Sequence, residues 1–112
     1  MIKNLVFDFG GVIADFDFSR ALAAFERVGL KNPTEYLDSF HQRGFFMELE
    51  SGRIGADEFV RRLSACAERE VSYAEAREAW LGFFLLPVPP ERLAALEELR
   101  RDYRLYVLSN TN

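Results

Sequence analysis

Two polar side chains in this sequence each follow a short apolar run, one near the start of the chain and one near its end. The run Leu5–Phe7 ends at Asp8, and the run Leu105–Leu108 ends at Ser109. A carboxylate held at the end of a buried strand can act as a nucleophile that forms an acyl phosphate, and a hydroxyl opposite it can hold a phosphate oxygen. Because a carboxylate and a phosphate repel each other, this chemistry also needs a divalent cation between them.

Glycines come shortly after Asp8 in the sequence, and an asparagine comes directly after Ser109. Gly10 and Gly11 follow Asp8 and allow the backbone to turn sharply and to approach an anion closely. Asn110 follows Ser109. Each feature alone is typical of an ordinary turn, but their combination at the ends of two apolar runs favours a phosphate site.

The elements between the two runs must bring them together. Both runs are typical of buried parallel strands, whose polar tips lie at the same carboxyl edge of an α/β sheet, where such folds bind ligands. A helix that begins at Pro90 and carries Leu93, Leu96 and Leu99 precedes the second run. The segment between is mostly helical and too long for a simple crossover, so we expect a helical insertion.

Helix signals recur through this insertion. Apolar residues keep helical spacing up to Gly29, and Asn32-Pro33 is typical of a helix start. A second amphipathic stripe covers Phe59–Cys66. Ser72 with Glu75 fits a capping box that opens a further helix.

The two strand ends resemble known motifs. Residues 5–13 resemble the first motif of the haloacid dehalogenase superfamily, and residues 105–111 resemble its second motif. Residues 46–54 look like the α-helical cap that one subgroup inserts between these motifs. Within the superfamily, the sequence looks most similar to sugar-phosphate phosphatases such as α-D-glucose-1-phosphate phosphatase.

The resemblance implies an α/β Rossmann-like core at residues 1–17 and 87–112, with a helical cap at 18–86. Asp8 would be the nucleophile and, with the backbone carbonyl of Gly10, would ligate Mg²⁺. Ser109 and the Asn110 backbone would hold the phosphoryl group of a small phosphorylated metabolite. Closure of the cap over the substrate would exclude water.

Two departures from the superfamily pattern matter. Most of its phosphatases carry a second Asp as general acid and base where this chain has Gly10. Asp15 and Asp17 lie nearby in an expected hairpin flap and are weighed as substitutes, but charged flap residues are expected to face solvent. The third and fourth motifs lie beyond Asn112 in the family, so we expect residues 1–112 alone to be poorly stable or inactive. A metal-independent 2-haloacid dehalogenase and a binding module without turnover therefore remain alternatives.

The composition limits the classes of partner that the chain is expected to bind. The formal net charge of −4 and the pI of about 5.0 argue against nucleic acid or an anionic membrane surface. A single cysteine, Cys66, fits a reducing cytosol and reads as core filling. His41 is expected to pack or to face solvent rather than act as a base. Trp80, Phe83 and Phe84 are expected to form the core of the cap, and the oligomeric state stays open.

Overall fold

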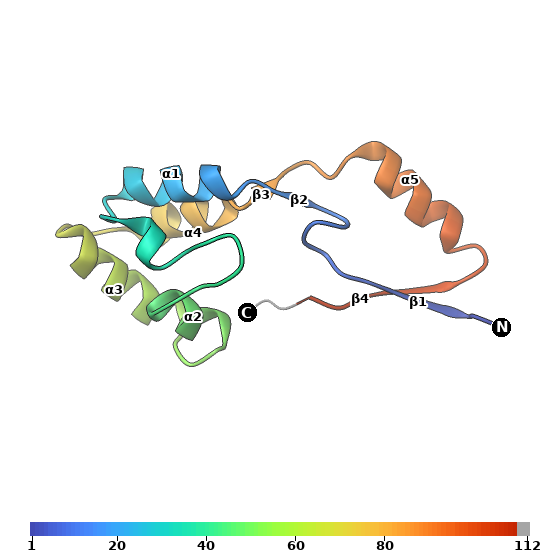
Figure 1. Cartoon of the computed structure of the whole chain (residues 1–112), viewed down its shortest axis with the longest axis horizontal. Coiled ribbons are helices and arrows are strands. Elements are labelled where there is room, and N and C mark those ends of the chain that lie inside the picture. The colour runs from blue at the N-terminus through green and yellow to red at the C-terminus, as the bar shows by residue number, and fades with distance from the viewer. Residues whose placement is uncertain (110–112) are drawn as a thin grey trace. The chain divides into compact units, whose positions relative to one another are not determined.

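The computed structural model describes residues 1–109, which form two compact units (Figure 1). The sheet unit comprises residues 1–16 and 84–109, and the helical unit comprises residues 17–83. The chain therefore leaves the sheet unit after Phe16 and returns at Phe84. The boundaries expected from the sequence, after residues 17 and 86, differ by one and three residues because Asp17 caps the first helix and Phe84 pairs in a strand.

The sheet unit contains two short sheets and one helix. Strands β1 (Asn4–Phe7) and β4 (Arg104–Val107) pair in parallel, in a register that sets Phe7 opposite Val107. Strands β2 (Asp15–Phe16) and β3 (Phe84–Leu85) pair antiparallel. Helix α5 (Pro90–Leu99) connects β3 to β4, and its start at Pro90 agrees with the sequence.

The helical unit is built from four α-helices and one short 3₁₀ helix within the described residues. They are α1 (Phe18–Val28), η1 (Pro33–Glu35), α2 (Phe45–Glu50), α3 (Ala56–Ala67) and α4 (Tyr73–Leu81).

Capping residues fix the ends of these helices. The Asp17 side chain accepts a hydrogen bond from the backbone N–H of Arg20, and α1 ends at Gly29, whose φ of 111° favours glycine. Ser72 and Glu75 form the predicted capping box at α4. A short helix does begin at Pro33 after Asn32, as expected, but Asn32 has a φ of 52° and its side chain makes no capping hydrogen bond.

Aromatic rings fill the core of the helical unit. Phe46 is fully buried, and its ring centroid lies 4.9 Å from that of Phe25, 5.0 Å from that of Phe59 and 5.7 Å from that of Trp80. Edge-to-face and stacked pairs of this kind add to the free energy gained from burial alone. Trp80 and Phe83 belong to this unit, as expected, whereas Phe84 lies in β3 of the sheet unit and contacts Phe9 and Phe16.

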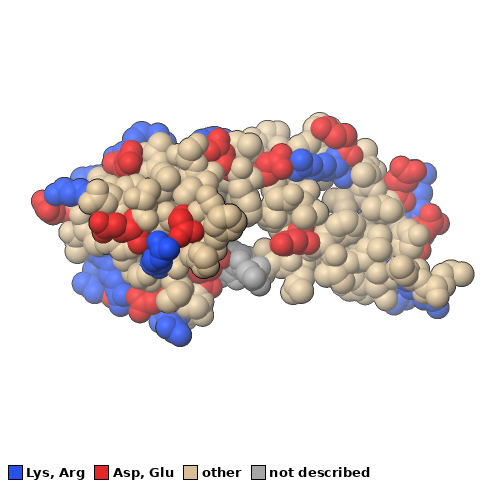
Figure 2. Space-filling model, in the orientation of Figure 1, with Lys and Arg blue, Asp and Glu red and all other residues tan. Residues whose placement is uncertain are grey.

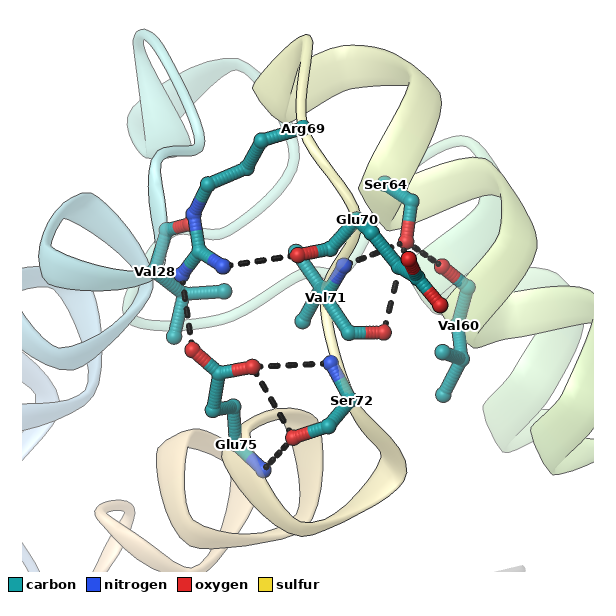
Figure 3. A network of polar contacts seen from close by, with 8 residues as sticks. All are labelled: Val28, Val60, Ser64, Arg69, Glu70, Val71, Ser72 and Glu75. Atoms are coloured by element: carbon teal, nitrogen blue, oxygen red, sulfur yellow. Dashed lines mark hydrogen bonds and ion pairs between the residues drawn. The ribbon is translucent and has the colours of Figure 1, made fainter.

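A polar network ties the connections between the helices together (Figure 3). The Arg69 guanidinium donates to the backbone carbonyls of Val28 and Glu70 at 2.9 and 2.8 Å, and to the Glu75 carboxylate at 2.9 Å. The Ser64 hydroxyl accepts from the backbone N–H of Val71 at 3.0 Å. One arginine thus links the end of α1, the segment before α4 and the first turn of α4.

The surface carries charges of both signs. Acidic and basic side chains are interspersed over the visible face of each unit rather than gathered by sign (Figure 2). No helix within residues 1–109 is both long and apolar enough to cross a bilayer.

Candidate active site

The candidate site lies at the carboxyl end of the parallel strands β1 and β4. The register continues past the strands, because the backbone N–H of Leu108 donates to the carbonyl of Phe7 at 2.8 Å. Asp8 and Ser109 follow these two residues directly. Parallel pairing therefore places both side chains at the same edge of the sheet, as the sequence predicts.

Both residues line one cavity of about 460 Å³, which is within the size range of small-molecule sites. Asp8 is exposed and Ser109 is partly buried. The lining residues of this cavity are Val6, Phe7, Asp8, Gly10, Phe16, Leu108 and Ser109. The structure thus brings together Asp8, Gly10 and Ser109, while Asn110 lies outside the described residues.

The loop after Asp8 is tightly closed. The carbonyl of Phe9 accepts from the backbone N–H groups of Ile13 and Ala14 at 2.9 and 3.0 Å, and the N–H of Gly11 donates to the carbonyl of Ala14 at 2.7 Å. Gly11 has a φ of 76°, a conformation that favours glycine. Ile13 and Ala14 are buried, so the end of the loop is anchored.

Asp8 keeps ligand capacity on its carboxylate. One oxygen, Oδ1, accepts a hydrogen bond from the backbone N–H of Phe9 at 2.8 Å, which fixes the orientation of the side chain. Among the hydrogen bonds of residues 1–109, none uses Asp8 Oδ2 or the carbonyl oxygen of Gly10. Two oxygen acceptors therefore remain for a ligand beside the cavity.

This donor set fits Mg²⁺. Magnesium prefers oxygen ligands and is commonly held by one or two carboxylates together with waters and substrate phosphate. Asp8 and the Gly10 carbonyl supply ligands of that kind. Within the described part of the chain, no group of three His, Cys, Asp or Glu side chains is placed to hold a metal, so a magnesium ion here would take its remaining ligands from elsewhere.

The two acids weighed as substitutes for a missing carboxylate at position 10 both accept hydrogen bonds from other residues. Both carboxylate oxygens of Asp15 accept from the Arg92 guanidinium, at 2.9 and 3.1 Å. The hydroxyl of Ser19 and, next, the N–H of Arg20 lower the pKa of Asp17 from its ordinary value. The expected hairpin flap is also absent at these residues, because β2 pairs with the distant β3.

Two residues of this region were missed by the sequence analysis. The ring of Phe16 lines the cavity, and Arg92 on α5 holds Asp15 and contacts the carbonyl of Ile13 at 3.4 Å. Neither has a local sequence signal, since both roles depend on segments about seventy residues apart.

The other candidate residues lie away from this cavity. The His41 side chain is 73% exposed and lies 3.5 Å from Asp38 Oδ1, which agrees with the expected solvent-facing position. Cys66 is partly buried, and its Sγ lies 3.8 Å from the Tyr36 hydroxyl. Neither residue belongs to the sheet unit that carries Asp8 and Ser109.

The sequence of the whole chain is similar to that of a known protein. No protein-family model matches the chain. The D-ribitol-5-phosphate phosphatase of Bacteroides thetaiotaomicron is 48% identical over 112 residues, which make up 100% of this chain and 54% of that relative. The chain therefore spans about half the length of the curated relative that it matches.

Solved structures also match the whole chain over about half of their own length. A variant of a HAD family enzyme of B. thetaiotaomicron, in complex with magnesium and inorganic phosphate, matches with a TM-score of 0.89 and 33% identity over 100% of this chain and 55% of its own. A protein of Porphyromonas gingivalis described as a predicted HAD-like family hydrolase matches with a TM-score of 0.85 and 39% identity, over 100% of this chain and 53% of its own.

Proposed function

We propose that this chain, which belongs to the HAD family, carries the nucleophile and part of the phosphate site of a magnesium-dependent phosphomonoesterase. The observation that supports this most directly is the single cavity lined by Asp8, Gly10 and Ser109 at the carboxyl end of two parallel strands. Two relatives support the same proposal: one is named as a D-ribitol-5-phosphate phosphatase, and the other is a HAD family enzyme solved in complex with magnesium and inorganic phosphate. The substrate class is a small phosphorylated metabolite.

In the first step, a carboxylate oxygen of Asp8 attacks the phosphorus atom of the ester. A bond forms between that oxygen and phosphorus, the bond from phosphorus to the ester oxygen breaks, and the leaving alkoxide takes a proton from solvent water. Water then attacks the phosphorus atom of the aspartyl phosphate: the bond from phosphorus to the Asp8 oxygen breaks, the attacking water gives up a proton to solvent, and inorganic phosphate and the free carboxylate result. The hydrogen bond from Phe9 to Asp8 Oδ1 orients the nucleophile before attack.

Ser109 and Asn110 are proposed to hold the phosphoryl oxygens during both steps, the first through its hydroxyl and the second through its backbone. Mg²⁺ held by the Asp8 carboxylate and the Gly10 carbonyl would neutralise charge between the nucleophile and the phosphate. The helical unit is proposed as the cap, since residues 17–83 are inserted between the two segments that form the sheet unit.

The test measures phosphate release from ribitol 5-phosphate and other sugar phosphates by the protein that contains this chain. We expect turnover that is lost with EDTA and restored by Mg²⁺. Asp8→Asn should reduce kcat by at least about 10⁴-fold, because an amide cannot form the covalent intermediate. The matched control is Asp102→Asn, an exposed acid just before the amino end of β4, which should leave kcat unchanged.

Each alternative gives a different result in the same assay. A dehalogenase would release halide from a 2-haloacid in the presence of EDTA and would still need Asp8. A binding module would bind inorganic phosphate without turning over any ester. Either result would contradict the proposed phosphatase.

A further inference from the structure

The space above Gly10 is already occupied by an aromatic ring. A Cβ atom built on Gly10 would lie 2.0 Å from Cζ and 2.1 Å from Cε2 of Phe16, far inside contact distance. The backbone itself does not demand glycine here, because Gly10 lies outside the positive-φ region, unlike Gly11. Glycine at position 10 is therefore required by the Phe16 ring and not by the turn.

The ring of Phe16 is supported from behind. Phe16 pairs with Phe84 across β2 and β3, and the two ring centroids lie 5.1 Å apart. Phe84 in turn lies 5.6 Å from Phe9 in an edge-to-face arrangement. Next to the ring, Asp15 is fixed by its two hydrogen bonds from Arg92. Rotating the ring away from Gly10 would break this packing.

Part of the Phe16 ring remains available to a ligand. Phe16 remains 53% exposed although it packs against Gly10 and Phe84, and it lines the same cavity as Asp8 and Ser109. The face of an aromatic ring is apolar and carries partial negative charge. It therefore favours contact with C–H groups and disfavours a second anionic group at the same place.

We infer that Phe16 is a specificity-determining residue: its ring takes the volume of a side chain at position 10 and contacts the leaving group of the phosphate ester. It selects leaving groups that present the C–H groups of an uncharged, hydroxylated carbon skeleton over leaving groups that carry a second phosphate. This inference rests on the proposed function for the identity of the ligand, but the packing of Phe16 against Gly10 can be tested separately.

The packing is tested by a double-mutant cycle on the unfolding of the full-length protein, which requires no activity. Gly10→Ala should lower the unfolding midpoint clearly in the wild-type background and much less in the Phe16→Ala background, because the clash then disappears. Gly55→Ala is the matched control, since nothing lies within 4 Å of a Cβ there. Additive effects of Gly10→Ala and Phe16→Ala would overturn the inference.

Contact with the ligand is tested by calorimetry in the Asp8→Asn background, where binding is measured without turnover. Adding Phe16→Ala should weaken binding of ribitol 5-phosphate about tenfold and change binding of inorganic phosphate less than twofold, because only the ester has a leaving group. Phe16→Tyr should retain most of the affinity for the ester. Ribulose 1,5-bisphosphate should bind no more weakly after Phe16→Ala.

Equal losses for the ester and for inorganic phosphate, or no loss for either, would overturn the role of Phe16 in specificity. Failure of the proposed function has a different signature. In that case the wild-type protein would release no phosphate from any ester, whatever the calorimetry of the Asp8→Asn variants shows.

Discussion

The two units of this molecule differ: one holds most of the buried core, and the other holds the candidate site residues. Of the seventeen buried hydrophobic residues within residues 1–109, the sheet unit holds only Ile13 and Ala14, and the helical unit holds the remaining fifteen. The sheet unit nevertheless carries Asp8, Gly10 and Ser109. The residues that we expect to react therefore lie in the unit with the smaller core.

The small core of the sheet unit has a structural reason. A pair of parallel strands has two faces, and each face needs a cover of helix or sheet to become buried. Val6, Tyr106 and Val107 keep 63%, 50% and 58% of their surface exposed, and α5 has no buried residue. In the helical unit, by contrast, each helix buries its apolar stripe against another helix or the aromatic cluster.

The largest expected effect on stability comes from truncating a buried ring of the helical unit, and the same change to a ring of the sheet unit should cost much less. Phe46→Ala should lower the free energy of unfolding by about 3–5 kcal/mol, because Phe46 is fully buried among other rings and leaves a cavity. Tyr106→Ala should cost roughly 1 kcal/mol or less, since half of that ring already contacts solvent. Urea unfolding measures both changes.

The single tryptophan provides a local probe for the larger of these effects. Trp80 contacts Phe46 directly, so its fluorescence reports the unfolding of the helical unit. Circular dichroism follows the remaining secondary structure. If Tyr106→Ala destabilised the protein as much as Phe46→Ala, the contrast between the two units would be wrong.

The helical unit was largely predictable because its signals are local. The stripe before Gly29, the stripe at Phe59–Cys66 and the capping box at Ser72 each lie within one helix, and all three agree with the structure. Local periodicity and capping chemistry decide such elements without reference to the rest of the chain. The predicted helix start at Asn32-Pro33 also agrees, although Asn32 adopts the αL conformation and its side chain makes no capping hydrogen bond.

The candidate site was only partly predictable. Asp8 and Ser109 each follow an apolar strand. Because parallel strands end at the same carboxyl edge of a sheet, the sequence was enough to predict that the two residues lie at one edge. The contacts of Phe16 with Gly10 and of Arg92 with Asp15 depend on β2 pairing with β3, which no local pattern in the sequence specifies. For the same reason Phe84 was assigned to the wrong unit.

The next effect in size concerns the start of α4. Ser72→Ala removes the side chain that accepts from the backbone N–H of Glu75, and we expect a loss of about 1 kcal/mol in the free energy of unfolding. Ser39→Ala is the matched control, because Ser39 is exposed and lies outside any helix, and it should stay within about 0.5 kcal/mol of wild type. A loss of the same size in both variants would mean that the capping box contributes little.

The smallest effect separates the charge of Glu75 from its capping hydrogen bond. Hydrogen bonds from Arg69 and then from the backbone and hydroxyl of Ser72 lower the pKa of Glu75 from 4.5 to about 2. A depressed folded-state pKa means that the carboxylate stabilises the fold above the unfolded-state pKa, and that this contribution disappears as the pH falls from about 4.5 to about 2.

Glu75→Gln tests this directly, because glutamine can keep the capping box but carries no charge to pair with Arg69. The urea midpoint, followed by Trp80 fluorescence, should be lower than wild type at pH 7 and should converge with wild type near pH 2. Because the Glu75 and Arg69 side chains are 43% and 42% exposed, 1 M NaCl should shrink the difference. A difference that persists at pH 2 would assign the contribution of Glu75 to its hydrogen bonds and packing rather than to its charge.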